Sequence, residues 1–253
     1  MKRILFIFLL CTIFSASQAQ IRSGVIATRA QVSGGGGEGV VKPWFIANDG
    51  KTIGWWIAAY ESSVTKDENN YVTAWADTLG NNDITTYGGT PIWSSDGILF
   101  DGTNDYLKSG SIAVYRPAIV YICFKQITWT NGDYIFDGYS SDGGLLQQKN
   151  TTPNIRVYAG AVGADNSAMT LDTWGYAIMC SNSTSSYLIV NGTTNGTENF
   201  GTNNMNGITL AASSGASAFG HIQIKEVILR YDNLDSEAQR DSVVTYFTNR
   251  YGL

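Results

Sequence analysis

The sequence has little of the material from which many catalytic and metal sites are built. It contains one histidine, His221, among 253 residues, so neither a His-based catalytic triad nor a multi-histidine metal site can be assembled from it. Only 15% of the residues are charged, whereas 12% are aromatic. A chain of this composition has enough apolar surface to offset the entropy lost on folding, which excludes disorder and predicts a globular core.

Basic residues are scarce as well. Lys and Arg number 16 against 21 Asp and Glu, and the formal net charge is −5. No cluster of Lys or Arg follows Arg3 in the sequence, whereas contact with a phosphate backbone requires such clusters. The charge pattern therefore excludes a nucleic-acid partner.

The clearest leader-like hydrophobic run lies at the N-terminus. Lys2 and Arg3 precede an apolar run over residues 4–14, which is too short to span a bilayer. Small residues then stand at Ser17 and Ala19, the two positions that a signal peptidase reads. Residues 1–19 are predicted to be a signal peptide, giving a secreted or cell-surface protein without a membrane span in its mature chain. The alternative is a buried N-terminal segment of a virion protein.

A flexible arm is expected after the leader. Residues 33–39 contain five glycines, which do not restrict the backbone. We predict an arm or linker over residues 20–52, serving as a tether or a simple spacer, and one folded domain over residues 53–253. About 200 residues suffice for one all-β domain with a sizeable core.

Two cysteines remain once Cys11 leaves with the leader. Cys123 and Cys180 lie in apolar runs at residues 119–124 and 176–180. An exported protein can join such a pair in one disulfide. Two separate buried thiols, acting as small hydrophobic side chains, are the favoured interpretation.

Short β-rich runs separated by turn signals fill the rest of the chain. Asn-Gly and Asp-Gly pairs, which suit turns with positive φ, recur at residues 96–97, 131–132, 191–192, 195–196 and 206–207. This spacing predicts an all-β fold, an antiparallel jelly-roll β-sandwich. A short C-terminal helix is expected as well, capped by Ser236, with Val243, Val244 and Phe247 on its apolar face and Gly252 at its end.

An ordered set of motifs adds a family resemblance to this pattern. The motifs are Trp75-Ala-Asp77, Phe100-Asp-Gly-Thr-Asn-Asp-Tyr-Leu107, Tyr187-Leu-Ile-Val-Asn-Gly192, Ile224-Lys-Glu-Val-Ile-Leu229, Leu234-Asp-Ser-Glu237 and the tail from Val244 to Leu253. In this order they resemble the concanavalin A-like lectin/glucanase superfamily, specifically the laminin-G-like jelly-roll domains of bacterial and phage surface proteins. The resemblance covers about four fifths of the chain.

The loop after Phe100 is the candidate metal site. Asp101, Asn104 and Asp105 offer the hard oxygen ligands that Ca²⁺ requires, six to eight in number. The same side chains also stabilise turns by bonding to the backbone, and this structural role is favoured. No other cofactor is expected.

Aromatic residues inside turn-rich stretches are the candidate ligand-binding residues. Trp93, Trp129, Tyr139 and Tyr87 could stack on sugar rings, with Asn and Asp side chains nearby for hydrogen bonds. These four residues are the predicted stacking positions of a lectin-like groove.

No enzymatic activity is expected from the sequence. The glucanases of the resembled superfamily carry a Glu-x-Asp-x-x-Glu pattern on one strand, whereas Glu226 stands alone on its strand-like run. We therefore expect a non-enzymatic extracellular binding module, with a glycan as the leading partner through the resemblance alone. The alternative is a structural virion or surface-assembly protein that attaches through its sandwich to a capsid, tail or fibre.

Leader cleavage can be checked directly. Expressed with its full sequence in a secreting host, the protein is expected to begin at Gln20, because cleavage follows Ala19. N-terminal sequencing of the purified protein measures this. An N-terminus at Met1 in purified particles would support the virion alternative instead.

Overall fold

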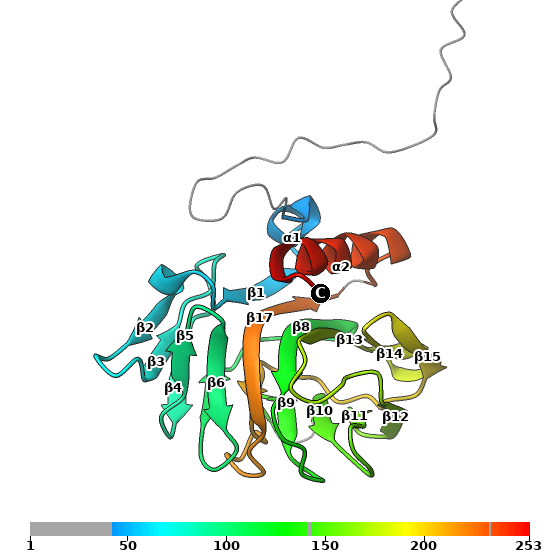
Figure 1. Cartoon of the computed structure of the whole chain (residues 1–253). Coiled ribbons are helices and arrows are strands. Elements are labelled where there is room, and N and C mark those ends of the chain that lie inside the picture. The colour runs from blue at the N-terminus through cyan, green and yellow to red at the C-terminus, as the bar shows by residue number, and fades with distance from the viewer. Residues whose placement is uncertain (1–41, 141–142, 233) are drawn as a thin grey trace, which may run out of the picture. The chain divides into compact units, whose positions relative to one another are not determined.

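Two antiparallel β-sheets pack face to face in this protein (Figure 1). The computed structural model describes residues 42–140, 143–232 and 234–253. The predicted leader, residues 1–19, and most of the predicted arm lie outside the described residues. The all-β sandwich with a C-terminal helix is confirmed.

The sheets are built from strands far apart in the sequence. The eight-stranded sheet runs in the order β15 (Thr193–Glu198), β14 (Ser186–Val190), β13 (Gly175–Ser181), β8 (Ala118–Gln126), β17 (His221–Tyr231), β6 (Gly97–Asp101) and β5 (Ile92–Ser94), and β1 (Thr52–Ile57) also pairs with β17. The nine-stranded sheet runs in the order β12 (Val162–Asn166), β11 (Ile155–Tyr158), β10 (Leu145–Gln148), β9 (Tyr134–Gly138), β16 (Ile208–Leu210), β7 (Tyr106–Ser109), β4 (Ile84–Gly88), β3 (Val72–Trp75) and β2 (Val64–Lys66). Short 3₁₀ helices occupy Glu61–Ser63 and Ser183–Ser185.

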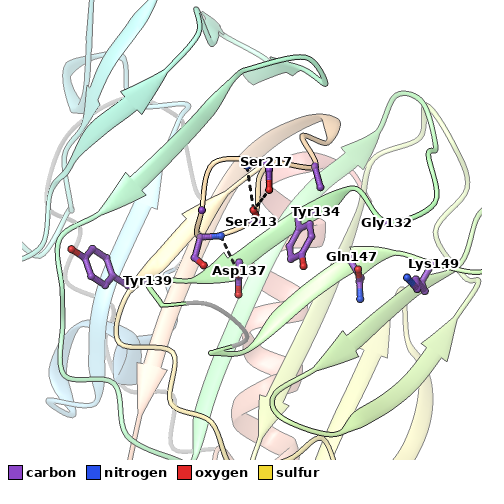
Figure 2. Close-up of a pocket in the computed structure, with 11 residues that line it drawn as sticks. Gly132, Tyr134, Asp137, Tyr139, Gln147, Lys149, Ser213 and Ser217 are labelled. Carbon is purple, nitrogen blue, oxygen red and sulfur yellow. Dashed lines mark hydrogen bonds between the residues drawn. The ribbon is translucent and has the colours of Figure 1, made fainter.

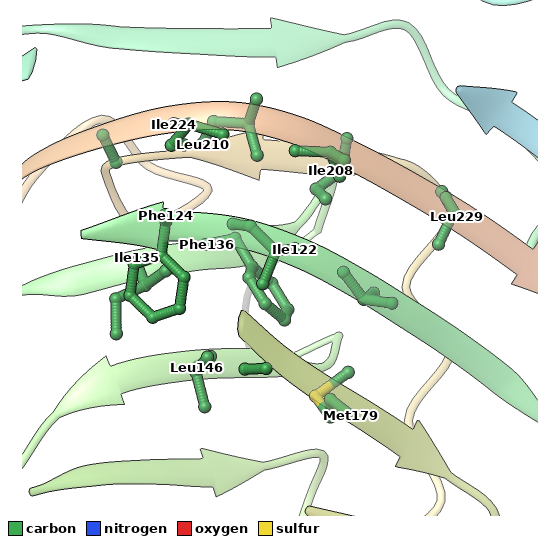
Figure 3. Close-up of a cluster of buried hydrophobic side chains, with 14 of the residues drawn as sticks. Ile122, Phe124, Ile135, Phe136, Leu146, Met179, Ile208, Leu210, Ile224 and Leu229 are labelled. Carbon is green, nitrogen blue, oxygen red and sulfur yellow. The ribbon is translucent and has the colours of Figure 1, made fainter. Parts of the chain in front are cut away.

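The main core lies between the two sheets. From the eight-stranded sheet, Ile122 and Phe124 of β8 point into it, and Phe136 and Leu146 of the nine-stranded sheet meet them (Figure 3). Side chains alternate between the faces of a strand, so only every second residue of β8 can reach this core. Its neighbours in sequence must therefore be buried elsewhere.

Those neighbours form a second apolar cluster on the outer face of the eight-stranded sheet. Ile119, Tyr121 and Cys123 of β8 pack there beneath helix α2 (Glu237–Tyr251) and helix α1 (Trp44–Asn48). Figure 1 shows α2 lying across this sheet beside β17. Burial on both faces explains why the sequence of β8 is an unbroken apolar run and not an alternating one.

Helix α2 begins and ends where the sequence predicts. The Ser236 side chain accepts a hydrogen bond from the Gln239 N–H at 3.2 Å, and the Gln239 side chain accepts one from the Ser236 N–H at 2.9 Å, which forms a capping box. Gly252 closes the helix in the left-handed conformation with φ of 69°. Val243 and Phe247 are buried.

Two buried polar residues of β17 tie the helices to the sheet. Arg230 donates to Asp49, next to α1, at 2.6 Å and to Asp235, just before α2, at 2.9 Å. Glu226 accepts from the indole N–H of Trp55 at 2.6 Å and from the hydroxyls of Tyr246 and Tyr251 on α2. Burial raises the pKa of Glu226, while the hydrogen bonds that it accepts oppose this shift.

Cys123 and Cys180 are free and buried, as favoured from the sequence. In the register of β8 with β13, Cys123 faces Tyr176 and Cys180 faces Ile119. Four residues of strand, about 13 Å, thus separate Cys180 from the position opposite Cys123. A disulfide requires Cα atoms no more than about 7 Å apart.

Helices α1 and α2 have 5 and 15 residues. Within residues 42–140, 143–232 and 234–253, none is long and apolar enough to cross a membrane.

The hydrogen bonds that Glu226 accepts predict that replacing its carboxylate by an amide destabilises the fold. Glu226→Gln is expected to lower the free energy of unfolding by about 1–3 kcal/mol, because an amide N–H₂ group would face the indole and hydroxyl donors in a buried site. Urea denaturation followed by tryptophan fluorescence measures this. The matched control is Glu68→Gln, which removes an exposed carboxylate. Equal stability of both variants and the wild type would contradict the assignment.

Candidate functional site

A cleft of about 680 Å³ opens on the nine-stranded sheet. It lies between strands β9 and β10 and the segment that connects β16 to β17 (Figure 2). Its size is that of cavities that hold small ligands. The lining residues are Gly132, Tyr134, Asp137, Tyr139, Gln147, Lys149, Ser213, Ser214, Gly215, Ser217 and Ala218.

A β-bulge in β9 creates the floor of the cleft. Leu146 of β10 pairs with Phe136, but the next residue, Gln147, pairs with Tyr134, so β9 contains one extra residue. Ile135 and Phe136 therefore both enter the core. Tyr134 and Asp137 line the cleft on the other face.

Strand β10 supplies the far end of the cleft. Gln147 and Lys149 are two residues apart and line it together. Between them, Gln148 points inward and organises the preceding loop, since its side chain accepts from the Thr130 N–H at 2.8 Å and donates to the Thr128 carbonyl at 2.8 Å. This anchoring positions Gly132 at the edge of the cleft.

A serine-rich loop, residues 211–219, forms one wall of the cleft, which we call the serine wall. Three hydrogen bonds fasten it to β9. The Ala211 N–H donates to the Ile135 carbonyl at 2.9 Å, the Tyr134 N–H donates to the Ala218 carbonyl at 3.0 Å, and the Ser214 N–H donates to the Asp137 carboxylate at 2.8 Å. Lys108 of β7 adds a fourth bond, donating to the Ser214 carbonyl at 2.7 Å. Two strands of the nine-stranded sheet thus hold the wall.

The serine wall is strained as well as fastened. Ala211, Ala216 and Ala218 have φ values of 62°, 55° and 52°. The left-handed conformation costs an alanine about 1 kcal/mol or more, because its Cβ approaches the carbonyl oxygen. Such outliers persist only where the surrounding contacts determine them, and they are frequent at ligand sites.

The lining residues form a row that contains both aromatic and polar side chains. Figure 2 shows Tyr139, Asp137, Tyr134, Gln147 and Lys149 in succession, with Ser213 and Ser217 on the wall above them. The Lys108 ammonium lies 4.6 Å from the centroid of the Tyr139 ring. The cleft thus offers two phenol rings, and carboxylate, carboxamide, hydroxyl and ammonium groups lie between and beside them. This arrangement suits an elongated molecule that has both flat apolar faces and many hydroxyl groups.

Comparison with known proteins gives a likeness of fold. No family model matches the chain, and no curated protein matches it. Among solved structures, Trypanosoma rangeli sialidase in complex with a difluoro-KDN compound is 12% identical, with a TM-score of 0.58 over 90% of this chain and 36% of that one. This chain thus spans about a third of the sialidase's length.

Two further neighbours are covered to a larger extent. Domain 4 of AbnA, a GH43 extracellular arabinanase from Geobacillus stearothermophilus solved in complex with arabinotriose, is 12% identical, with a TM-score of 0.54 over 76% of this chain and 98% of that one. A GH54 α-L-arabinofuranosidase is 14% identical, with a TM-score of 0.52 over 70% and 50%. These proteins share the β-sandwich with this chain.

These neighbours correct the functional expectation. The prediction of a non-enzymatic binding module, with a virion or surface-assembly protein as its alternative, is wrong on this comparison, because the sandwich recurs in glycoside hydrolases. The prediction that the chain has no enzymatic activity is contradicted by the same comparison. That exclusion rested on one glucanase pattern, whereas glycosidic cleavage depends on the separation of two carboxylates in space and not on their spacing in sequence.

One of the four predicted stacking residues, Tyr139, lines the cleft. Trp129 donates from its indole N–H to the Asn154 carbonyl, which also accepts from the Lys149 N–H, so it lies behind the Lys149 end. Trp93 of β5 donates to the Ala58 carbonyl at 2.8 Å and packs against the main core. Tyr87 of β4 is 46% exposed and is not among the lining residues.

The Asp-rich loop holds its turn through backbone bonds. Asp101 accepts from the N–H groups of Thr103 and Asn104, and buried Asp105 accepts from those of Thr90 and Asp101. A calcium ion would compete with these bonds. Within the described part of the chain, no group of three or more His, Cys, Asp or Glu side chains is placed to hold a metal.

Sequence reasoning missed most of the cleft. Tyr134 and Asp137 stand at the two ends of a run that reads as a buried strand, and Gln147 and Lys149 belong to the polar stretch Gln147-Gln-Lys-Asn150. The one usable signal is the stretch Ala211-Ala-Ser-Ser-Gly-Ala-Ser-Ala218, a run of small residues between two apolar strands. Such a run lets a connecting segment lie close to a sheet.

The Asp-rich loop yields a prediction about stability. Asp105→Ala is expected to lower the free energy of unfolding by about 1–3 kcal/mol, because it leaves two N–H groups without their buried acceptor. Asp101→Ala removes an exposed carboxylate from a local turn and is expected to cost less. Thermal melting with and without EDTA measures both variants, and no shift on chelation is expected in the wild type. A wild-type melting temperature that falls on chelation and returns with Ca²⁺ would favour the metal site.

Proposed function

We propose that this chain recognises glycans in the service of glycoside hydrolysis, and that the cleft beside the serine wall holds the sugar chain. The observation that carries the proposal is the row of lining residues from Tyr139 to Lys149. Sugar rings present an apolar face to aromatic side chains and hydroxyl groups at their rims. The cleft offers both kinds of partner along one line.

The fold neighbours support the same proposal. Sialidase, arabinanase and arabinofuranosidase are glycoside hydrolases by their names, and the arabinanase domain was solved with arabinotriose. This chain corresponds to a third to a half of two of these enzymes and to nearly all of the isolated arabinanase domain. We therefore propose a glycan-recognising domain of the kind that glycoside hydrolases contain.

The finer family and the chain's organisation belong to this proposal. The order of sequence motifs supports a concanavalin A-like sandwich of the laminin-G-like type. The apolar run at residues 4–14 supports a cleaved leader over residues 1–19 and export to the cell exterior. Extracellular polysaccharides would then be the accessible partners.

The cleft can be tested by a pair of tyrosine variants. The full-length protein is screened by isothermal titration calorimetry against arabinotriose, sialyllactose, and oligosaccharides of β-glucan and galacturonan. For a glycan that binds, Tyr139→Ala is expected to weaken affinity at least tenfold, about 1.4 kcal/mol, because it removes an aromatic face from the cleft. Tyr87→Ala is the matched control, since it removes an exposed tyrosine outside the cleft.

Two results would contradict the proposal. One is an absence of binding to any of these glycans, and the other is equal binding by both tyrosine variants. Reducing ends released from each bound glycan are measured in the same samples. Release that Asp137→Asn abolishes would assign bond cleavage to the cleft itself, because Asp137 is the carboxylate that lines it.

A further inference from the structure

One end of the cleft carries a cation without a partner. Lys149 follows β10 directly and is partly exposed. Within residues 42–140, 143–232 and 234–253, its ammonium group makes no ion pair, hydrogen bond or ring contact. Every other lysine of this part of the chain has such a partner: Lys51, Lys66, Lys125 and Lys225 pair with carboxylates, and Lys42 and Lys108 lie over aromatic rings.

The neighbour of Lys149 on the same face has unused donors too. The carboxamide of Gln147 makes no hydrogen bond within the described residues, whereas that of Gln148, between them, makes three. Residues two apart on a strand lie about 6.6 Å apart and point to the same side. Gln147 and Lys149 therefore present two free donor groups to one volume of the cleft.

Two other charged groups near the cleft, Asp137 and Arg156, have partners already. Asp137 is buried and accepts from the Ser214 and Gly138 N–H groups. Arg156 of β11, which pairs with Gln147 in the sheet register, forms an ion pair with Asp165 of β12. The Lys149 ammonium is thus left for a ligand.

We propose that the Lys149 end of the cleft binds the carboxylate of an acidic sugar, so that the recognised glycan carries uronic acid or sialic acid residues. This inference rests on the proposed function and names its ligand class. The Lys149 ammonium and the Gln147 amide would each donate to the carboxylate, forming a charge-assisted pair at one end. The neutral part of the chain would lie along Tyr134 and Tyr139.

Matched glycan pairs test the carboxylate. Oligogalacturonate is compared with its carboxyl-reduced form, and sialyllactose with lactose, by calorimetry on the full-length protein. The wild type is expected to bind the carboxylated member of at least one pair at least tenfold more tightly, and raised salt is expected to reduce this preference. The pair that shows the preference identifies the source of the carboxylate.

Three variants assign the preference to Lys149. Lys149→Gln is expected to bind both members of the pair alike, and Lys149→Arg to retain most of the preference. Lys51→Gln removes the same charge from an exposed ion pair with Asp232, outside the cleft, and is expected to behave as the wild type. Melting temperatures confirm that the variants fold.

The outcomes separate this inference from the proposed function. Equal affinity of the wild type for both members of both pairs, with Tyr139→Ala still weakening binding, would overturn the acidic ligand and leave glycan recognition standing. Preference for a sulfated galactan over its unsulfated form, without a carboxylate preference, would also overturn it. Binding to none of these glycans would overturn both.

Discussion

Burial of both faces of the eight-stranded sheet is the constraint on which the rest of this structure depends. Helices α1 and α2 cover its outer face, and Glu226 and Arg230 of β17 fasten them there through buried hydrogen bonds. Removing one partner from a buried charged network leaves the other uncompensated, so this layer tolerates little change. The cleft lies instead on the nine-stranded sheet, where the helices do not pack.

The cleft exists because that sheet is irregular. A regular β9 would alternate its side chains, and the adjacent residues Ile135 and Phe136 could not both face the core. The extra residue lets two adjacent apolar side chains enter the core and leaves Tyr134 and Asp137 on the cleft side. The Asp137 carboxylate then holds the Ser214 N–H, so the same irregularity both opens the floor and fixes the wall.

The fold was predictable from the sequence to a larger extent than the site. Turn residues at regular spacing indicated the sandwich, and Ser236, Val243, Phe247 and Gly252 marked the closing helix, because these signals are local. The layer beneath α2 and the β9 bulge depend on which strands become neighbours, and no local pattern specifies that. Tyr139 was found because it lies in a turn-rich stretch, whereas Lys149 looked like any surface lysine. Its lack of a partner is a property of the assembled sheet.

The three left-handed alanines of the serine wall bear on how a ligand is received. Glycine could adopt the same backbone angles without a steric cost, but it would leave the loop freer to move. Alanine gives up some folding energy and narrows the ensemble of the empty protein. A wall already confined in this way loses little conformational entropy when it is occupied, so more of the contact energy appears as affinity. The strain in these residues thus trades thermal stability for a cleft wall whose shape is already set in the empty protein.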